Sequence, residues 1–152
     1  MSLTYNEFNE KFLIMVNQED GNCLFESMSN LVNEHHTIIR QKVFNFYKTF
    51  DRTQKYDHHT IEYAIVLGLT FDNVDGEFKH EEFIGFDNVW ASMTDILVTS
   101  LLYKVEINIY KYDEVINKYI VDKVKYQYKN YRELHILYSN NNHFEALIPI
   151  KL

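Results

Sequence analysis

Residues 20–25, with the sequence DGNCLF, constrain the fold of this chain more than any other stretch. Gly21 permits a sharp backbone turn, and apolar residues then recur from Leu24 at i, i+4, i+7 and i+8, which predicts an amphipathic helix. Cys23, the only cysteine, is therefore expected at the start of a helix. Unpaired N–H groups and the helix dipole lower the pKa of a thiol there, and the same N–H groups suit an oxyanion. A lone cysteine can also be a small buried core residue, so both interpretations stay open at this point.

The composition predicts one folded domain. The chain has 152 residues, of which 46% are hydrophobic and 16% aromatic, and this excludes a disordered segment. A single cysteine excludes an internal disulfide framework and a Cys-based zinc site, and it suits a reducing compartment such as the cytoplasm. No signal peptide is visible, and the longest apolar runs are too short to span a bilayer. We therefore expect a monomeric cytoplasmic domain over residues 1–152, without membrane contact, in which residues 1–3 resemble an expression-vector scar.

The net charge of −7 is unevenly distributed. Residues 1–103 carry 7 Lys and Arg against 16 Asp and Glu, whereas residues 104–152 carry 8 against 6. This acidic balance argues against nucleic acid as a partner, since nucleic acid requires a basic surface, and it favours a basic protein. The abundance of Tyr, Asn, Ile and Lys with one proline is typical of an AT-rich genome, such as that of a virus or parasite.

The periodicity of apolar residues changes along the chain from helical to strand-like. Helices are predicted over residues 4–12, from Cys23, over 37–50 and 57–67, and after a capping box formed by Ser92 and Asp95. Gly68 is expected to end the fourth helix, and a long acidic loop follows over residues 70–89. Strands are predicted over 105–110, which alternates as a half-buried strand, and over 115–121, 134–138 and 143–150, with a turn at 140–142. Helices followed by strands indicate an α+β fold: a small, mostly antiparallel central sheet flanked by helices.

One histidine has the setting of a catalytic base. His143 begins a predicted strand, and Glu145 lies two residues later, on the same face of that strand. Glu145 is therefore placed to orient the imidazole of His143, as a nucleophile–base–acid arrangement requires. Another acid, Glu10, Glu19 or Asp20, is the alternative orienter. The remaining histidines are interpreted as surface, cap or packed residues, and no metal site is expected from their spacing.

These stretches resemble the ovarian tumour (OTU) family of cysteine proteases, which cleave ubiquitin from proteins and from polyubiquitin chains. DGNCLF at residues 20–25 is similar to the nucleophile motif of that family. WAS at 90–92, followed by a helix and a strand, resembles its central block, and HFEAL at 143–147 resembles its closing block. The three blocks stand in the order and spacing of the family over roughly residues 13–150.

The resemblance implies an OTU-like fold, with a central sheet between helical layers, and a set of roles. Cys23 would be the nucleophile and His143 the general base. Asp20, with the backbone of Gly21 and Asn22, would shape the oxyanion hole. Glu145 departs from the Asp or Asn usual in the family, so the resemblance leaves the third member of the triad open.

The function implied by the resemblance is a deubiquitinase that hydrolyses peptide and isopeptide bonds after the C-terminal glycine of ubiquitin, without cofactor or metal. The alternatives are a ubiquitin-binding module without activity, and the same chemistry on a ubiquitin-like modifier. Because the tail of ubiquitin carries arginines, acidic residues of the long loop are candidate substrate contacts. These candidates are Glu77, Glu81, Glu82 and Asp87.

Overall fold

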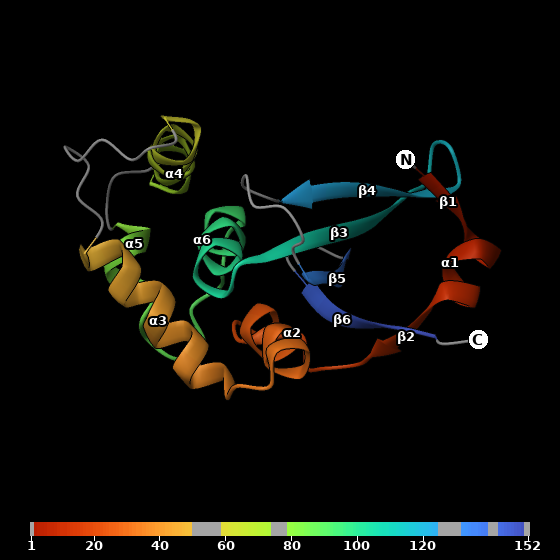
Figure 1. Cartoon of the computed structure of the whole chain (residues 1–152), viewed down its shortest axis with the longest axis horizontal. Helices are drawn as coiled ribbons and strands as arrows, with labels where there is room; N and C mark the ends of the chain where they lie inside the picture. The colour runs from red at the N-terminus through yellow and green to blue at the C-terminus, as the bar shows by residue number, and fades with distance from the viewer. Residues whose placement is uncertain (1, 50–58, 74–78, 125–131, 140–142, 151–152) are drawn as a thin grey trace.

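The computed structural model describes residues 2–49, 59–73, 79–124, 132–139 and 143–150, and shows one six-stranded sheet with helices on both faces (Figure 1). The helices are α1 (Tyr5–Lys11), α2 (Cys23–Val32), α3 (His36–Thr49), α4 (His59–Asp72), α5 (His80–Phe83) and α6 (Met93–Tyr103). The strands are β1 (Ser2–Thr4), β2 (Phe12–Met15), β3 (Val105–Asp113), β4 (Lys118–Val124), β5 (Arg132–Ser139) and β6 (His143–Pro149). Their order in the sheet is β1-β4-β3-β5-β6-β2, and all neighbours are antiparallel except β3 and β5. The α+β prediction is confirmed, with a mixed sheet.

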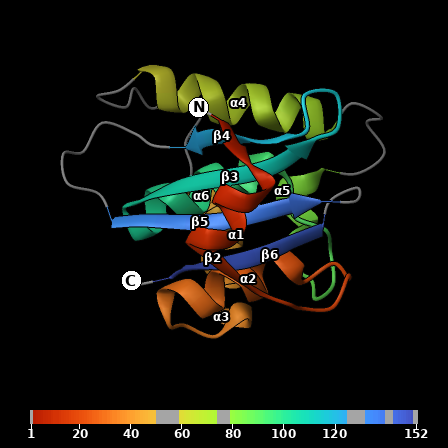
Figure 2. The ribbon, with the colours of Figure 1, turned by 90° about the vertical axis from the view of Figure 1, so that its right-hand side faces the viewer.

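The main core lies between the sheet and the helices α2, α3, α4 and α6. Alternate residues of β3, such as Ile107, and of β6, such as Phe144, point into this core, where they meet Phe25 of α2 and Ile96 of α6. Figure 2 shows α2 lying along β6 on this side of the sheet. The consequence for the site is that the start of α2 and the start of β6 are held against one another.

The opposite face of the sheet carries a smaller core that α1 covers. Phe8 of α1 is fully buried and stacks on Tyr119 of β4, with ring centroids 3.9 Å apart. Leu3 of β1 and Tyr110 of β3 belong to the same cluster. Residues 105–110 are therefore buried on both faces, and the prediction of a half-buried strand is wrong. A period-2 pattern predicts that one face of the strand is solvated. In this fold, Phe8 of α1 packs on that face at Tyr110.

The fourth helix also differs from the prediction. Gly68 does not end it, because α4 continues to Asp72. A Cβ atom on Gly68 would lie 2.3 Å from Oγ1 of Thr94 in α6, so this glycine permits a close helix–helix approach. The predicted loop over 70–89 contains the end of α4 and the short helix α5, and β4 begins three residues later than predicted. The capping box of Ser92 and Asp95 is confirmed.

Two further predictions concern the ends of elements. The predicted turn at 140–142 lies outside the described residues. Residues 1–3 were expected to be a vector scar. Residues 2 and 3 belong to β1, which pairs with β4, and the side chain of Leu3 is buried. Among the described residues, no helix is long and apolar enough to cross a bilayer.

Candidate active site

The Cys23 turn (residues 20–23) leads directly into α2, as the sequence predicts. Asn22 occupies the N-cap position but does not cap the helix with its side chain. Its Oδ1 instead accepts hydrogen bonds from the backbone N–H of Asn88, at 2.9 Å, and from Nη2 of Arg40, at 2.7 Å. A Cβ atom on Gly21 would lie 1.8 Å from the backbone oxygen of Asn88, so only glycine fits there. The turn is thus built against the segment before α6.

The side chain of Cys23 is buried, with 1% of its surface exposed. The backbone N–H of Phe144 donates to its Sγ at 3.4 Å, which places the thiol beside the residue that follows His143. Burial raises the pKa of the Cys23 thiol, and the charge of Asp20 adds to this, while the N–H of Phe144 opposes it. The sequence led us to expect a lowered pKa, because the helix N-terminus was considered without the burial. A thiol in this setting requires a base to remove its proton.

His143, the candidate base, directly precedes the residue whose N–H contacts this thiol. Its side chain is buried at the start of β6, and its Nε2 lies 3.7 Å from Oε1 of Glu145, close enough for an ion pair but not for a direct hydrogen bond. Its Nδ1 is buried and has no hydrogen-bond partner in the described part of the chain. Nε2 of the ring therefore faces Glu145, and Nδ1 can still accept a proton. Among the described residues, no hydrogen bond or ion pair joins His143 to Glu10, Glu19 or Asp20.

One residue that the sequence did not point to connects the two halves of the site. Nδ2 of Asn17 lies 3.2 Å from the backbone oxygen of Cys23, 3.1 Å from Oγ of Ser27 and 2.9 Å from the backbone oxygen of Phe144. It thereby links the first turn of α2 to β6. A lone asparagine in a polar connection carries no sequence signal for such a role, since its partners are up to 127 positions away.

The N–H groups expected to form an oxyanion hole already have acceptors. The N–H of Asn22 donates to Oδ1 of Asp20 at 2.9 Å, and that of Cys23 to the backbone oxygen of Asp20 at 3.3 Å. The N–H of Gly21 donates to Oδ1 of Asn88 at 2.9 Å. The acceptors of Asn22 and Gly21 belong to the side chains of Asp20 and Asn88, whose rotation would free both N–H groups for another acceptor.

The acidic candidates are spread over different surfaces. Glu77 lies outside the described residues. Oε2 of Glu81 accepts a hydrogen bond from Asn73 at 2.9 Å, and Glu82 is exposed on α5. Asp87 is exposed next to Asn88, and it is the candidate that adjoins the Cys23 turn. The lining of a cavity of about 250 Å³ includes residues 91–93 and Phe144, whose N–H contacts Cys23, but no residue of the Cys23 turn.

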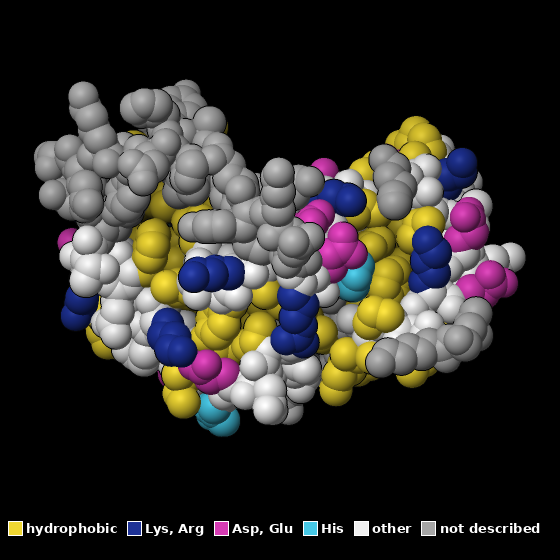
Figure 3. Space-filling model, in the orientation of Figure 1, with side chains coloured by type: hydrophobic (Ala, Val, Ile, Leu, Met, Phe, Trp, Pro, Cys, Tyr) yellow, Lys and Arg dark blue, Asp and Glu magenta, His cyan; other side chains and the backbone are white. Residues whose placement is uncertain are grey.

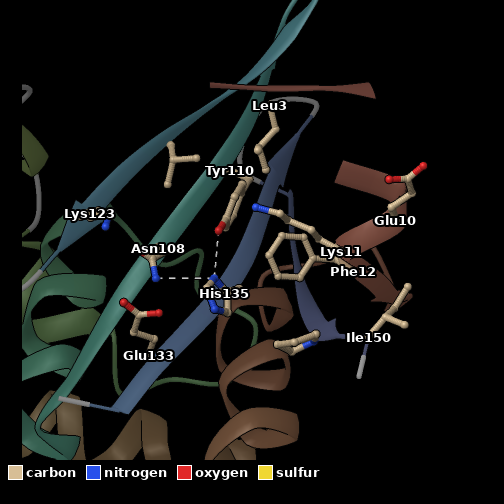
Figure 4. Close-up of a pocket in the computed structure, with 12 residues that line it drawn as sticks. Leu3, Glu10, Lys11, Phe12, Asn108, Tyr110, Lys123, Glu133, His135 and Ile150 are labelled. Carbon is tan, nitrogen blue, oxygen red and sulfur yellow. Dashed lines mark hydrogen bonds between the residues drawn. The ribbon is translucent and has the colours of Figure 1, made fainter. Parts of the chain in front are cut away.

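A second cavity, of about 450 Å³, lies on the α1 side of the sheet and contains no residue of the Cys23 turn (Figure 4). His135 lines it, with Nδ1 3.0 Å from the hydroxyl of Tyr110, and burial lowers the pKa of this histidine. Lys11, Lys123, Glu10 and Glu133 also line the cavity, so its charges balance. Figure 3 shows, in the view of Figure 1, a histidine side chain with acidic and basic side chains near it among apolar ones in the right-hand half of the molecule. His135 is a packed residue, as predicted.

Comparison with known proteins identifies the fold. No protein-family model matches the sequence, and no curated protein matches it. Among solved structures, the Hazara virus OTU bound to ubiquitin is 18% identical, with a TM-score of 0.67 over 100% of this chain and 88% of that one. The viral OTU domain protease from Qalyub virus is 17% identical, with a TM-score of 0.61 over 99% and 89%. An OTU deubiquitinase from Wolbachia pipientis wMel bound to ubiquitin is 14% identical, with a TM-score of 0.56 over 91% and 96%. This chain therefore has the fold of the OTU domain proteases.

Proposed function

We propose that the chain is a cysteine-dependent deubiquitinase that hydrolyses bonds after the C-terminal glycine of ubiquitin. The observation that carries this proposal is the contact of Phe144 N–H with Sγ of Cys23, which joins the start of α2 to the strand of His143 and Glu145. Similar folds have been solved with ubiquitin bound, which supports ubiquitin as the partner.

In the first stage, Nδ1 of His143 accepts the thiol proton of Cys23, and Sγ attacks the carbonyl carbon of the terminal glycine. The imidazolium is stabilised by the carboxylate of Glu145. Negative charge develops on the carbonyl oxygen, and the N–H groups of the Cys23 turn receive it in place of the Asp20 and Asn88 side chains. The C–N bond then breaks, and His143 gives its proton to the departing lysine amine, which leaves a thioester on Cys23.

In the second stage, water attacks the thioester carbonyl while His143 accepts a proton from it. The C–S bond breaks, His143 gives this proton to the thiolate, and ubiquitin leaves as a carboxylic acid that loses its remaining proton to solvent. Each proton that His143 receives leaves it again within the same stage.

The test is a probe with an electrophile on the C-terminus of ubiquitin. We expect the wild-type chain to form a covalent adduct at Cys23, and Cys23→Ala to form none while it keeps its fold and still binds ubiquitin. Removal of this small side chain should change the free energy of unfolding by about 1 kcal/mol. A parallel probe built on a ubiquitin-like modifier distinguishes the second substrate class. Undiminished cleavage of diubiquitin by Cys23→Ala would refute the proposal.

One observation favours a binding module without activity as the second candidate. The thiol of Cys23 has a raised pKa, and the turn's N–H groups are already bonded. If the probe does not label Cys23 but ubiquitin binds the wild-type chain, this second candidate is the correct one.

A further inference from the structure

The guanidinium of Arg40 lies at the junction of the Cys23 turn and the segment before α6. Arg40 is on α3 and only 2% of its surface is exposed. Its Nη2 donates to the backbone oxygen of Gly21 at 3.0 Å and to Oδ1 of Asn22 at 2.7 Å. Its Nη1 donates to the backbone oxygens of Ile84 at 2.8 Å and Val89 at 3.0 Å. One side chain thus holds two segments that are more than sixty residues apart in the chain.

The bond to Gly21 has a geometric consequence for the reaction. All described peptide bonds are trans, so the C=O of Gly21 and the N–H of Asn22 lie in one peptide plane and point in opposite directions. Because Arg40 fixes the direction of that C=O, it also fixes the direction of the N–H of Asn22. This N–H is one of the donors that the proposed mechanism directs at the oxyanion.

Steric restraint alone does not determine this peptide plane. A flip of the plane between Gly21 and Asn22 changes ψ of Gly21, which is little restricted because glycine has no Cβ atom. It also moves φ of Asn22 from −97° to a positive value, which asparagine tolerates better than most residues. A flipped plane would turn the carbonyl oxygen of Gly21 toward the oxyanion position, where it would repel the developing charge. A fixed donor is what makes such a site effective, because no reorganisation is then needed during the reaction.

We propose that Arg40 is a positioning residue for the proposed hydrolysis. Its guanidinium locks the peptide plane between Gly21 and Asn22 so that the N–H of Asn22 faces the reacting carbonyl. It also holds the turn against residues 84–89, which include Asn88 and precede α6. In this proposal Arg40 does not touch the substrate or the thiol, and it acts only by positioning the Cys23 turn. The inference rests on the proposed function for its catalytic consequence but not for its geometric one.

The test compares Arg40→Met and Arg40→Lys with the wild type on a fluorogenic ubiquitin amide. Displacement of a reacting group by about 1 Å can cost about a hundredfold, so Arg40→Met should lower kcat by about that factor with little change in KM. Arg40→Lys keeps the charge but lacks the planar fork, so it should lie between. Arg132→Met is the matched control, because Arg132 donates to the backbone oxygen of Leu31 at the other end of α2. It should retain the wild-type kcat.

A second readout separates positioning from a general loss of structure. Alkylation of Cys23 by iodoacetamide forms a C–S bond and releases iodide without an oxyanion, so its rate should be nearly the same in the wild type and in both Arg40 variants. Parallel loss of alkylation and turnover, or an unchanged kcat in Arg40→Met, would overturn the proposal.

Hydrogen exchange keeps the inference testable if the wild type does not hydrolyse ubiquitin substrates, in which case the proposed function fails. The lock on the peptide plane then predicts faster exchange confined to residues 20–23 and 84–89 in both Arg40 variants. Exchange equal to that of the wild type in these segments would overturn it. If Arg40→Met does not fold, Arg40→Lys alone decides by the same comparison.

Discussion

At the scale of single residues, the site combines groups whose environments oppose one another. Burial raises the pKa of the Cys23 thiol, while the neighbouring N–H of Phe144 favours the thiolate. In the proposed mechanism, full activation therefore depends on proton transfer to His143 rather than on the helix N-terminus alone. The same proposal makes the orientation of His143 depend on Glu145, whose Oε1 is 3.7 Å from its Nε2. This gap makes Glu145 the residue whose contribution is most informative.

We predict that Glu145→Ala lowers turnover by about ten- to hundredfold, less than the roughly ten-thousandfold that a closely bonded triad acid can contribute. Glu145→Gln should lie between, since its amide oxygen still accepts a hydrogen bond but carries no charge for the imidazolium. Glu145→Asp should be tolerated. Turnover at saturating ubiquitin substrate measures all three.

Glu19→Ala is the matched control for these variants, because Glu19 is exposed and belongs to the alternative set of acids. Full activity in Glu145→Ala, together with a large loss in a variant of Glu10, Glu19 or Asp20, would assign the orienting role to that acid instead.

At the scale of elements, close contacts join α6 to the helices α3, α4 and α5. Gly68 of α4 faces Thr94 of α6, and α6 begins directly after the segment that packs on the Cys23 turn. His80 of α5 is tied to α6 by its Nε2, which lies 2.7 Å from Oδ2 of the fully buried Asp95. Tyr47 of α3 donates to the other oxygen of Asp95 at 2.7 Å. Three helices thus meet at one carboxylate.

The contact of α4 with α6 predicts a sign reversal in a double-mutant cycle. Gly68→Ala should lower the free energy of unfolding by about 1–3 kcal/mol, because the new methyl group overlaps Oγ1 of Thr94. This occurs although alanine has the higher helix propensity, by about 1 kcal/mol. In a Thr94→Ala background the overlap is removed, and Gly68→Ala should be neutral or stabilising. Denaturant unfolding of the four variants measures the coupling.

A cost of Gly68→Ala that is equal in both backgrounds would show that Thr94 is not the obstacle.

The contact of His80 with Asp95 predicts a dependence of stability on pH. Burial lowers the pKa of His80, but the hydrogen bond and the charge of Asp95 outweigh it, and the net shift is upward. A group whose pKa is raised on folding contributes stability that is complete below its unfolded pKa of about 6.5 and is lost as the pH rises through the folded value. His80→Asn should therefore destabilise the chain more at about pH 5.5 than at about pH 8.5.

Chemical unfolding at these two pH values measures the difference, with His35→Asn as the control. His35 is exposed, and its ring contacts only the neighbouring residues Thr37, by a hydrogen bond, and His36, by stacking. A larger cost of His80→Asn at the higher pH would contradict the assignment.

At the scale of the whole molecule, the sequence predicted what is local and missed what is distant. The helix after Cys23, the capping box of Ser92 and the strand of His143 follow from neighbouring residues, and all are present. The contacts of Arg40 with the Cys23 turn could not be predicted, because the partners are eighteen or more positions away and arginine on a helix is usually solvated. The raised pKa of Cys23 was missed for the same reason: burial is a property of the assembled fold.

The whole-molecule charge leads to the last prediction, which concerns the arginines in the tail of ubiquitin. Asp87 is exposed beside the segment that packs on the Cys23 turn, whereas Glu82 is exposed on α5. Asp87 is also close to Arg40, the residue that contacts the Cys23 turn. Burial lowers the pKa of Arg40, and the charge of Asp87 opposes this shift more than any other charge does. Asp87→Lys should lower kcat/KM for ubiquitin substrates by about thirtyfold, as expected for loss of one close charge pair of about 2 kcal/mol.

Glu82→Lys makes the same change in net charge and is the matched control. If only the overall field attracted ubiquitin, both variants would lose the same activity, and added salt would abolish both effects together. A local contact at Asp87 instead predicts a loss in Asp87→Lys that exceeds the loss in Glu82→Lys and persists in part at high salt, because a desolvated pair is screened less than an exposed one. Measurement of kcat/KM for both variants at low and high salt decides between the two, and equal losses would reduce the role of the acidic residues to net charge.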